Sequence, residues 1–356
     1  MEIAIALLRV IGIIIGVIVG LIVLELAIVA LVPGFSVPRQ RLGNERDLIT
    51  QEGAPPCLLK KEVSFEVKGT SISAWLYLPE NVSFPVPCII MGNGFGGTKD
   101  VILETYAIRY QQAGLAVLVF DYRHFGESEG EPRQLLWIPY QLEDYGAAIE
   151  YARGLKEVDP ARIALWGTSM SGGHVIVAAA KDHQIACVSA QCPGLDGRAS
   201  ARMAFRREGI NFRMIMHGQR DLVRSWLGLS PHTIPIVGRP GSIACMTTPD
   251  AYEFFKNLAP DSFINEACAR IIIRGDKHRP VTFARNVRCP VLLQICVHDN
   301  ITPLSAAEET ENELGKYAEV KRYPIGHFDI YSGDNFEKAL GDQLDFFKNH
   351  LLLKHL

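Results

Sequence analysis

No two of the eight cysteines are spaced as a C-x-x-C pair, and several fall inside apolar runs such as 87–91 and 291–297. This spacing argues against a disulfide framework or a zinc site and is typical of buried thiols, which favours a reducing compartment. No block of lysine and arginine occurs, and the net charge is only −3, so nucleic acid is not expected as a partner. Charged residues make up 21% and hydrophobic residues 48% of the 356 residues, enough for a large packed core.

Residues 3–32 are almost wholly apolar and are interrupted only by Arg9 and Glu25. A membrane-spanning helix needs about 20 apolar residues, so the segment is long enough if Glu25 lies near one interface. The alternative is a cleaved signal peptide, but the apolar stretch is long and no small-x-small cleavage site is evident. We therefore predict a single-pass N-terminal transmembrane helix.

Positive charges flank this segment on both sides. Arg39, Arg41 and Arg46 follow it, whereas Arg9 and the amino terminus precede it. The positive-inside rule then favours a cytoplasmic location for the rest of the chain, in agreement with the cysteines. Residues 35–57, which contain several Pro and Gly and charges of both signs, are predicted to be a linker.

Short apolar runs alternate with helical stretches over residues 58–351, after an antiparallel hairpin signal at the turn 68–70. This alternation predicts an α/β domain with a mostly parallel sheet flanked by helices on both faces. The expected strands are 62–67, 72–78, 86–91, 115–120, 162–166, 185–190, 291–297 and 319–323, and the expected helices are 99–113, 139–156, 171–180 and 335–351.

The alternation is interrupted between about 193 and 287. Basic helical stretches at 198–207 and 211–227 and a Pro/Gly-rich span at 231–241 occur there. We interpret this segment as a cap inserted between strands, above the carboxyl ends where ligands bind in such sheets.

The first chemical motif is a serine between an expected strand and an apolar helix. The strand 162–166 runs into Gly167-Thr168-Ser169-Met170-Ser171. A nucleophilic serine needs its hydroxyl exposed on such a tight turn, with small residues two positions to either side. Gly167 and Ser171 are both small, although the usual motif has glycine at the second position. Ser169 is therefore the candidate nucleophile, and a serine that merely caps the helix is the alternative.

A glycine-rich loop at 92–97 follows the strand 86–91. Acyl chemistry needs two backbone N–H donors for an oxyanion, and the amides of Phe95 in this loop and of Met170 after the serine are the candidates. The letters Gly92-x-Gly94-x-x-Gly97 also match a dinucleotide-binding loop, with Asp121 where a ribose-binding acid would lie. That reading is the main competitor.

An acid and a histidine later in the chain decide against a dinucleotide site. Asp299 follows the strand 291–297, and His327 lies in the loop after the last expected strand. The order Ser, Asp, His is the one that a triad on this kind of sheet uses. His327 would take the proton from Ser169, and Asp299 would orient the imidazole and stabilise its cation. His174 is expected to be a packing residue, His298 at most a neighbour of the site, and Asp121 a structural residue that shapes its loop.

Together these motifs resemble the α/β-hydrolase superfamily, most closely the dienelactone-hydrolase-like and Xaa-Pro-peptidase-like serine hydrolases. The likeness covers roughly residues 58–351 and is carried by the segments 94–100, 120–123, 166–174, 299–303 and 326–328. It implies the α/β-hydrolase fold and a Ser169–His327–Asp299 triad. The family usually has His-Gly before the oxyanion-loop Phe, where this chain has Asn93-Gly94.

The leading functional hypothesis is a serine esterase-like hydrolase that cleaves a carboxylic ester, or a related acyl bond, of a small-molecule acyl substrate through a Ser169 acyl-enzyme. One alternative is an acyl or polyketide transferase or a peptidase that uses the same triad. Another is a membrane-tethered binding protein that has kept the fold without activity. No cofactor motif or metal cluster is found, so no cofactor and no metal are expected.

Overall fold

The computed structural model describes residues 2–31, 37, 42, 59–209 and 211–353. The predicted linker 35–57 therefore lies outside the described residues, apart from 37 and 42. Eight strands form one sheet in the order β1-β2-β4-β3-β5-β6-β9-β10. These strands are β1 (Lys60–Val67), β2 (Thr70–Tyr77), β3 (Val86–Gly92), β4 (Ala116–Phe120), β5 (Val158–Thr168), β6 (Cys187–Gln191), β9 (Val291–Cys296) and β10 (Ala318–Tyr323).

The sheet is mixed because β2 runs antiparallel to both of its neighbours, β1 and β4. All pairs from β4 to β10 are parallel. This agrees with the hairpin and the mostly parallel sheet predicted from the sequence. The strands β3, β4 and β9 are buried along their whole length and almost entirely apolar, as expected for strands in a sheet that is covered on both faces.

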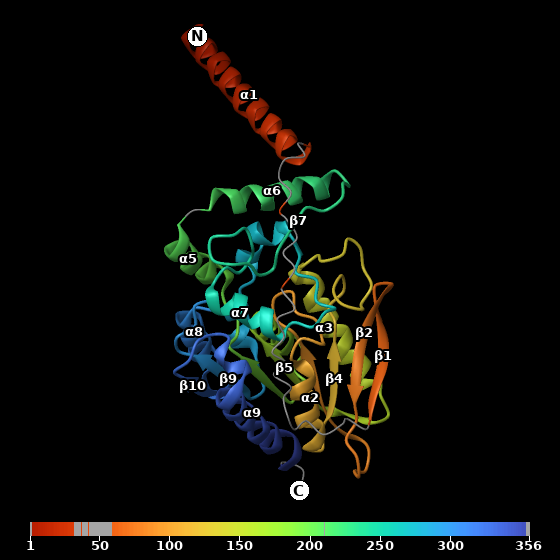
Figure 1. Cartoon of the computed structure of the whole chain (residues 1–356). Coiled ribbons are helices and arrows are strands. Elements are labelled where there is room, and N and C mark those ends of the chain that lie inside the picture. Colours follow the sequence, from red (N-terminus) through yellow and green to blue (C-terminus); the bar gives the residue numbers. More distant parts are fainter. Residues whose placement is uncertain (1, 32–36, 38–41, 43–58, 210, 354–356) are drawn as a thin grey trace.

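Two hydrophobic cores lie on opposite faces of the sheet. Because side chains alternate along a strand, Cys88 and Ile90 of β3 enter one core, whereas Ile89 and Met91 enter the other. The first core includes α3 (Ile138–Arg153), α4 (Met170–Lys181) and α8 (Leu304–Leu314). The second includes α2 (Leu103–Gln112) and α9 (Gly333–Phe347). The helices thus cover both faces (Figure 1).

The strand order reverses direction at β3, since β4 pairs with one of its edges and β5 with the other. At such a switch point the loops after the two adjoining strands separate and leave a crevice at the carboxyl ends. Here those loops are 93–97 after β3 and the turn at Ser169 after β5. The topology therefore brings together the glycine-rich loop and the serine turn found in the sequence.

The segment between β6 and β9 folds as a separate layer of short elements, which we call the insertion. It contains α5 (Gly197–Glu208), α6 (Phe212–Trp226), β7 (Thr233–Ile234), α7 (Pro249–Leu258), β8 (Ala267–Cys268) and several 3-10 turns. The two basic helical stretches predicted at 198–207 and 211–227 correspond to α5 and α6. Residues of α5 line a cavity together with Ser169, so the insertion lies over the carboxyl ends of the sheet.

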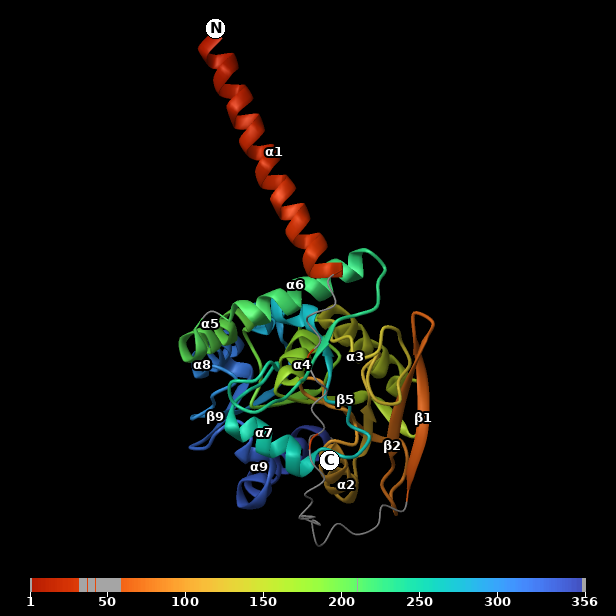
Figure 2. The ribbon, with the colours of Figure 1, turned by 45° about the horizontal axis from the view of Figure 1, so that its top comes forward.

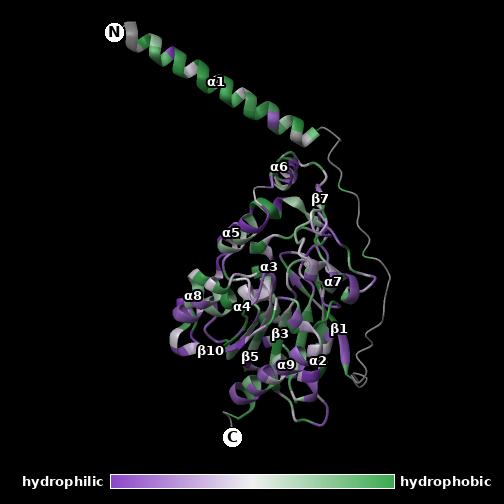
Figure 3. Ribbon diagram, turned by 60° about the vertical axis from the view of Figure 1, so that its left-hand side comes forward, coloured by the Kyte–Doolittle hydropathy of each residue, from purple (hydrophilic) through white to green (hydrophobic). Residues whose placement is uncertain are grey.

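Helix α1 (Glu2–Leu31) projects from the rest of the molecule and is apolar along most of its length (Figure 3). Among the described residues, its stretch Ile5–Ile28 is the one helix long and apolar enough to cross a membrane. Its 24 residues would extend about 36 Å, which matches a bilayer core. A signal sequence near the N-terminus would pass the same test.

Outside the insertion, two helices differ most from the sequence-based expectation. Helix α2 begins at Leu103 rather than at residue 99, because the main chain of Lys99 is held in the loop by the carboxylate of Asp121 at 2.6 Å. Helix α8 was not predicted. Its sequence, LSAAEETENEL, buries only Ala306, Ala307, Thr310 and Leu314, so its apolar side is too weak to stand out.

Candidate active site

Ser169 lies at a strained turn between β5 and α4. Its backbone angles, φ 53° and ψ −122°, are unusual for a residue other than glycine. A side chain at Gly167 would lie 2.3 Å from the carbonyl oxygen of Ser171, so only glycine permits this close approach of strand and helix. The turn has the geometry that presents a serine hydroxyl at the head of a helix.

Ser171, which stands where the usual motif has glycine, ties this turn to the neighbouring strand. Its hydroxyl accepts a hydrogen bond from the N–H of Thr168 at 2.9 Å and donates to the carbonyl of Gly92 at 2.6 Å. The side chain is fully buried. Ser171 therefore forms a polar link between the end of β5 and the end of β3, which a glycine at this position could not form.

We expect Ser171→Ala to lower the free energy of unfolding by about 1–3 kcal/mol, because it leaves the buried N–H of Thr168 without its partner. Ser189 offers a matched control, since its hydroxyl is equally buried but has no hydrogen-bond partner among the described residues. Ser189→Ala should be close to neutral. Urea denaturation of both variants measures the difference, and equal destabilisation by the two changes would contradict this role of Ser171.

The structure brings Ser169, His327 and Asp299 together. Nε2 of His327 lies 3.1 Å from Oγ of Ser169, and its Nδ1 lies 2.6 Å from Oδ2 of Asp299. The side chains of His327 and Asp299 are each only 2% exposed. A continuous chain of hydrogen bonds thus links three residues that come from the ends of β5, β9 and β10. This arrangement can move a proton from a serine hydroxyl to a neutral imidazole.

The carboxylate of Asp299 is fixed by its own loop. Oδ1 accepts hydrogen bonds from the N–H groups of Ile301 at 2.7 Å and Thr302 at 2.6 Å, and Oδ2 accepts one from the Thr302 hydroxyl at 2.7 Å. None of the sequence motifs indicates a role for Thr302. An Asp followed three residues later by Thr in a loop is the signal that could have indicated this turn.

Burial and neighbouring charges shift the pKa values of both Asp299 and His327. Burial alone would raise the pKa of Asp299, but the charge and hydrogen bonds of His327, with those of Thr302, hold that pKa below its usual value. Burial alone would lower the pKa of His327, yet the adjacent Asp299 carboxylate raises it above the usual 6.5. Each group therefore stabilises the charged form of the other, which is the state that appears when His327 accepts a proton.

The loop after β3 places a second set of groups beside Ser169. Asn93 donates hydrogen bonds to the carbonyls of Thr98 and Val101, both at 2.8 Å, and accepts one from the N–H of Gly94 at 2.7 Å. Phe95 and Met170 both line the cavity that Ser169 enters. No hydrogen bond joins the N–H of either residue to another described residue, so both amides are available to an incoming oxygen atom.

Asp121 is committed to the structure rather than to a ligand. It is buried and binds the N–H and Nζ of Lys99, at 2.6 and 2.8 Å, and the N–H of Glu127 at 3.0 Å. These bonds occupy both carboxylate oxygens, which confirms the structural role predicted for Asp121. A buried carboxylate whose two oxygens are both engaged is poorly suited to bind a ribose, so the reading of residues 92–97 as a dinucleotide-binding loop is disfavoured.

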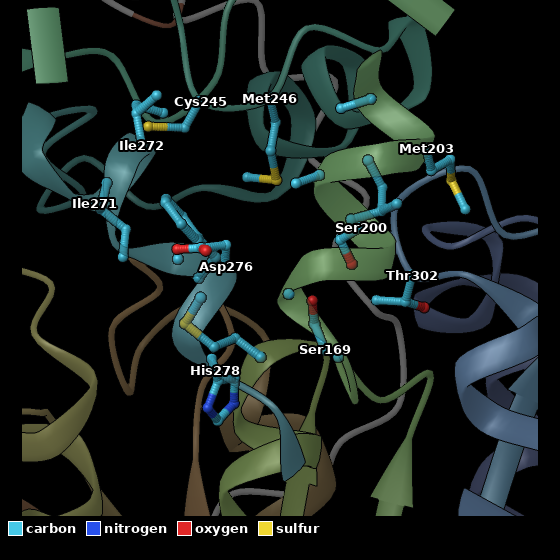
Figure 4. A pocket seen from close by; sticks show the side chains of 18 of the residues that line it. Ser169, Ser200, Met203, Cys245, Met246, Ile271, Ile272, Asp276, His278 and Thr302 are labelled. Carbon is cyan, nitrogen blue, oxygen red and sulfur yellow. The ribbon is translucent and has the colours of Figure 1, made fainter. Parts of the chain in front are cut away.

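The Ser169 hydroxyl opens into a largely apolar cavity of about 260 Å³ (Figure 4). Helix α5 supplies one wall through Ser200, Ala201, Met203, Ala204 and Arg207. Opposite them lie Met246, Ile271, Ile272 and His278. Ser169 also borders a second, small space of about 30 Å³ that His327 lines. The serine therefore lies between the imidazole of His327 and a space suited to an apolar group.

His278 and the α5 residues are parts of the cavity wall that the sequence did not indicate. Burial lowers the pKa of His278 to about 4, so its imidazole is neutral at physiological pH. The predictions for two other histidines agree with the structure. His174 is fully buried, with its Nε2 2.9 Å from Gln141, and His298 is exposed beside Asp299. None of the described residues forms a cluster that could hold a metal ion.

The sheet order, the serine turn after β5 and the loops at the switch point define the class of α/β hydrolases. The family model described as X-Pro dipeptidyl-peptidase (S15 family) matches residues 68–216. The chain is 39% identical to the quorum-quenching protein AidA of Acinetobacter baumannii over 299 residues, which cover 82% of this chain and 96% of that protein. It is also 38% identical to the thiohydrolase aneE of Aspergillus aculeatus, over 82% of this chain and 93% of that protein.

A solved structure agrees with these relatives. The crystal structure of the α/β hydrolase GrgF from Penicillium superposes with a TM-score of 0.71 at 25% identity, covering 83% of this chain and 99% of that one. The curated sequence of grgF is described as a polyketide transferase. The chain therefore belongs to the α/β-hydrolase superfamily and is a hydrolase.

Proposed function

We propose that the protein cleaves a carboxylic ester, or a related acyl bond such as a thioester, through a covalent intermediate on Ser169. The observation that carries the proposal is the chain of hydrogen bonds from Asp299 through His327 to Ser169, which ends at an apolar cavity. The names of two relatives, a thiohydrolase and a polyketide transferase, support acyl chemistry. The apolar cavity wall favours a hydrocarbon acyl group.

In the first half of the reaction, Oγ of Ser169 attacks the carbonyl carbon while Nε2 of His327 takes the hydroxyl proton. The amides of Phe95 and Met170 receive the negative oxygen of the tetrahedral intermediate. His327 then gives its proton to the leaving alcohol or thiol, and the acyl group remains as an ester on Ser169. In the second half, water attacks that ester while it loses a proton to His327. The bond between Oγ of Ser169 and the acyl carbon then breaks, His327 returns the proton to Oγ, and the carboxylic acid is released.

The domain organisation belongs to the same proposal. Residues 3–32 would anchor the protein in a membrane, residues 35–57 would connect the anchor, and residues 58–351 would form the hydrolase domain. The insertion, about 193–287, would act as a cap, because α5 closes one side of the cavity. The proposal places the hydrolase domain on the cytoplasmic side, in line with the free cysteines. All seven described cysteines are free thiols, and six of them are buried.

A series of nitrophenyl esters of increasing acyl length tests the substrate class. Each methylene that enters the cavity is worth about 0.8 kcal/mol, so kcat/KM should rise roughly fourfold per carbon until the cavity is full. Ala204 lines the cavity, and Ala204→Phe should move the optimum to shorter chains. An activity that does not depend on acyl length in either protein would contradict an acyl group bound in this cavity.

Acyl transfer to an acceptor other than water is the second candidate, and the polyketide-transferase name of grgF favours it. A transferase would pass the acyl group from Ser169 to an alcohol or amine that reaches the ester before water. Product analysis in the presence of added alcohols and amines separates the two. If esters or amides of the added acceptors outweigh the free acid, transfer is favoured. If only the free acid forms, hydrolysis is favoured.

A further inference from the structure

An exposed apolar surface follows one side of α6 and the turn after it. Phe212 is 69%, Trp226 65% and Leu227 58% exposed, and Ile215 and Leu229 are also exposed. Phe212, Ile215 and Trp226 recur at helical spacing, so they lie on one side of α6. We call these five residues the α6 surface. Several large apolar side chains this exposed along one side of a helix mark an interaction site rather than an ordinary soluble face.

Exposed arginines lie near the amino-terminal end of α6, at one end of this apolar surface. Residues 197–229 contain seven arginines and only two acidic residues, Glu208 and Asp221. Asp221 is buried and paired with Arg270. Near the junction of α5 and α6, Arg202, Arg206 and Arg213 are exposed, and none pairs with a carboxylate of a described residue. An amphipathic helix with aromatic residues on one side and arginines beside them is typical of a helix that lies in a membrane interface.

The position of α1 decides which partner fits. The carboxyl-terminal end of α1 lies against α6, and two views agree that α1 leaves the molecule at this point (Figures 1 and 2). If α1 crosses a bilayer, the membrane surface begins where the helix ends. Among the described elements, α6 is therefore next to the lipid headgroups. A bilayer could cover the apolar α6 surface and bind the neighbouring arginines, so no protein partner is needed to cover it.

We propose that the α6 surface docks on the anionic lipid bilayer that α1 crosses, with the aromatic and aliphatic side chains in the interface and the arginines on acidic headgroups. The proposal rests on α1 as the membrane anchor and is independent of the reaction at Ser169. Docking would hold the domain in one orientation, and it would bring α5, which forms a wall of the cavity, close to the lipid.

Quenching of tryptophan fluorescence by lipids brominated on their acyl chains tests the proposal in the full chain. The protein is reconstituted into vesicles of brominated phosphatidylcholine with phosphatidylserine, and flotation confirms its insertion. The bromine quenches only at short range, so a tethered but undocked domain keeps Trp226 unquenched. Trp226→Phe should remove most of the quenchable signal. Trp75→Phe is the matched control, because Trp75 lies in β2, outside the α6 surface, and should leave the quenching unchanged.

The triple variant Arg202→Gln/Arg206→Gln/Arg213→Gln tests the electrostatic part. Each arginine near an anionic surface contributes about a fivefold change in binding. The tryptophan quenching of the variant in vesicles that contain phosphatidylserine should therefore be as weak as that of the wild type in vesicles of phosphatidylcholine alone. Equal quenching of wild type and Trp226→Phe at every lipid composition would overturn the proposal, and would leave a protein partner as the occupant of this surface. A chain that fails to float with the vesicles would contradict both the docking and the anchor.

Discussion

Ser169→Ala is expected to reduce kcat by about 10⁴- to 10⁶-fold on any ester that the wild type cleaves, because the proposed mechanism forms its covalent intermediate on the Ser169 hydroxyl. The fold should survive, since the hydroxyl of Ser169 bonds only to His327 among the described residues. Hydrolysis of a nitrophenyl ester, corrected for the uncatalysed rate, measures the loss. Circular dichroism confirms that the variant is folded.

Ser200 provides the matched control for this change. Its hydroxyl lines the same cavity (Figure 4), but it has no bond to an imidazole of a described residue. Ser200→Ala should therefore change kcat by less than about tenfold, through packing of the substrate alone. If Ser169→Ala and Ser200→Ala had similar activities, Ser169 would not be the nucleophile, and the position of the serine at the strained turn would need another explanation.

Asp299→Asn is expected to reduce kcat by about 10⁴-fold, the loss that this change causes in serine proteases. An amide at this position can donate to Nδ1 of His327, which puts the ring proton on Nε2. In that tautomer Nε2 cannot accept the proton of Ser169, and no carboxylate stabilises the cation. Thr302→Val, which removes one hydrogen bond to the carboxylate and keeps the charge, should have a far smaller effect.

The pH profile gives an independent readout of Asp299. The proposed reaction needs neutral His327, so kcat/KM should rise as the pH passes upward through the pKa of that imidazole. The carboxylate of Asp299 opposes the effect of burial and raises this pKa above 6.5, so the acid limb of the wild type should lie above pH 6.5. Without the charge, burial lowers the pKa, and the limb of Asp299→Asn should move to lower pH. A limb that stays in place would contradict the pairing.

The sheet and the three site residues could be predicted from the sequence because each leaves a local signal. Apolar runs bounded by turns predict β3, β4, β5 and β9, and Gly167 marks a close approach of two chains. Asp299 and His327 each follow a strand, and parallel strands bring their carboxyl ends to one edge. Their convergence near Ser169 then follows from the topology.

The cavity wall could not be predicted in the same way. Helix α5 buries none of its residues, and its sequence, GRASARMAFRRE, has few large apolar side chains that would indicate which side faces Ser169. The role of Ser171 could not be predicted from the sequence for a different reason. In the sequence, Ser171 is only a departure from the usual glycine of the motif. The structure shows that its hydroxyl donates to the carbonyl of Gly92 at 2.6 Å, and Gly92 is 79 positions away in the chain. Contacts of this kind depend on the fold and not on the neighbouring sequence.

The most direct test of the central claim is mass spectrometry after reaction with a fluorophosphonate, which forms a stable adduct only with an activated serine. The wild type should gain the mass of one probe on the peptide that contains Ser169, and Ser169→Ala should gain none. His327→Ala should react far more slowly, because the hydroxyl would lose its base. Equal labelling of the wild type and Ser169→Ala, or an adduct on another serine, would contradict the account.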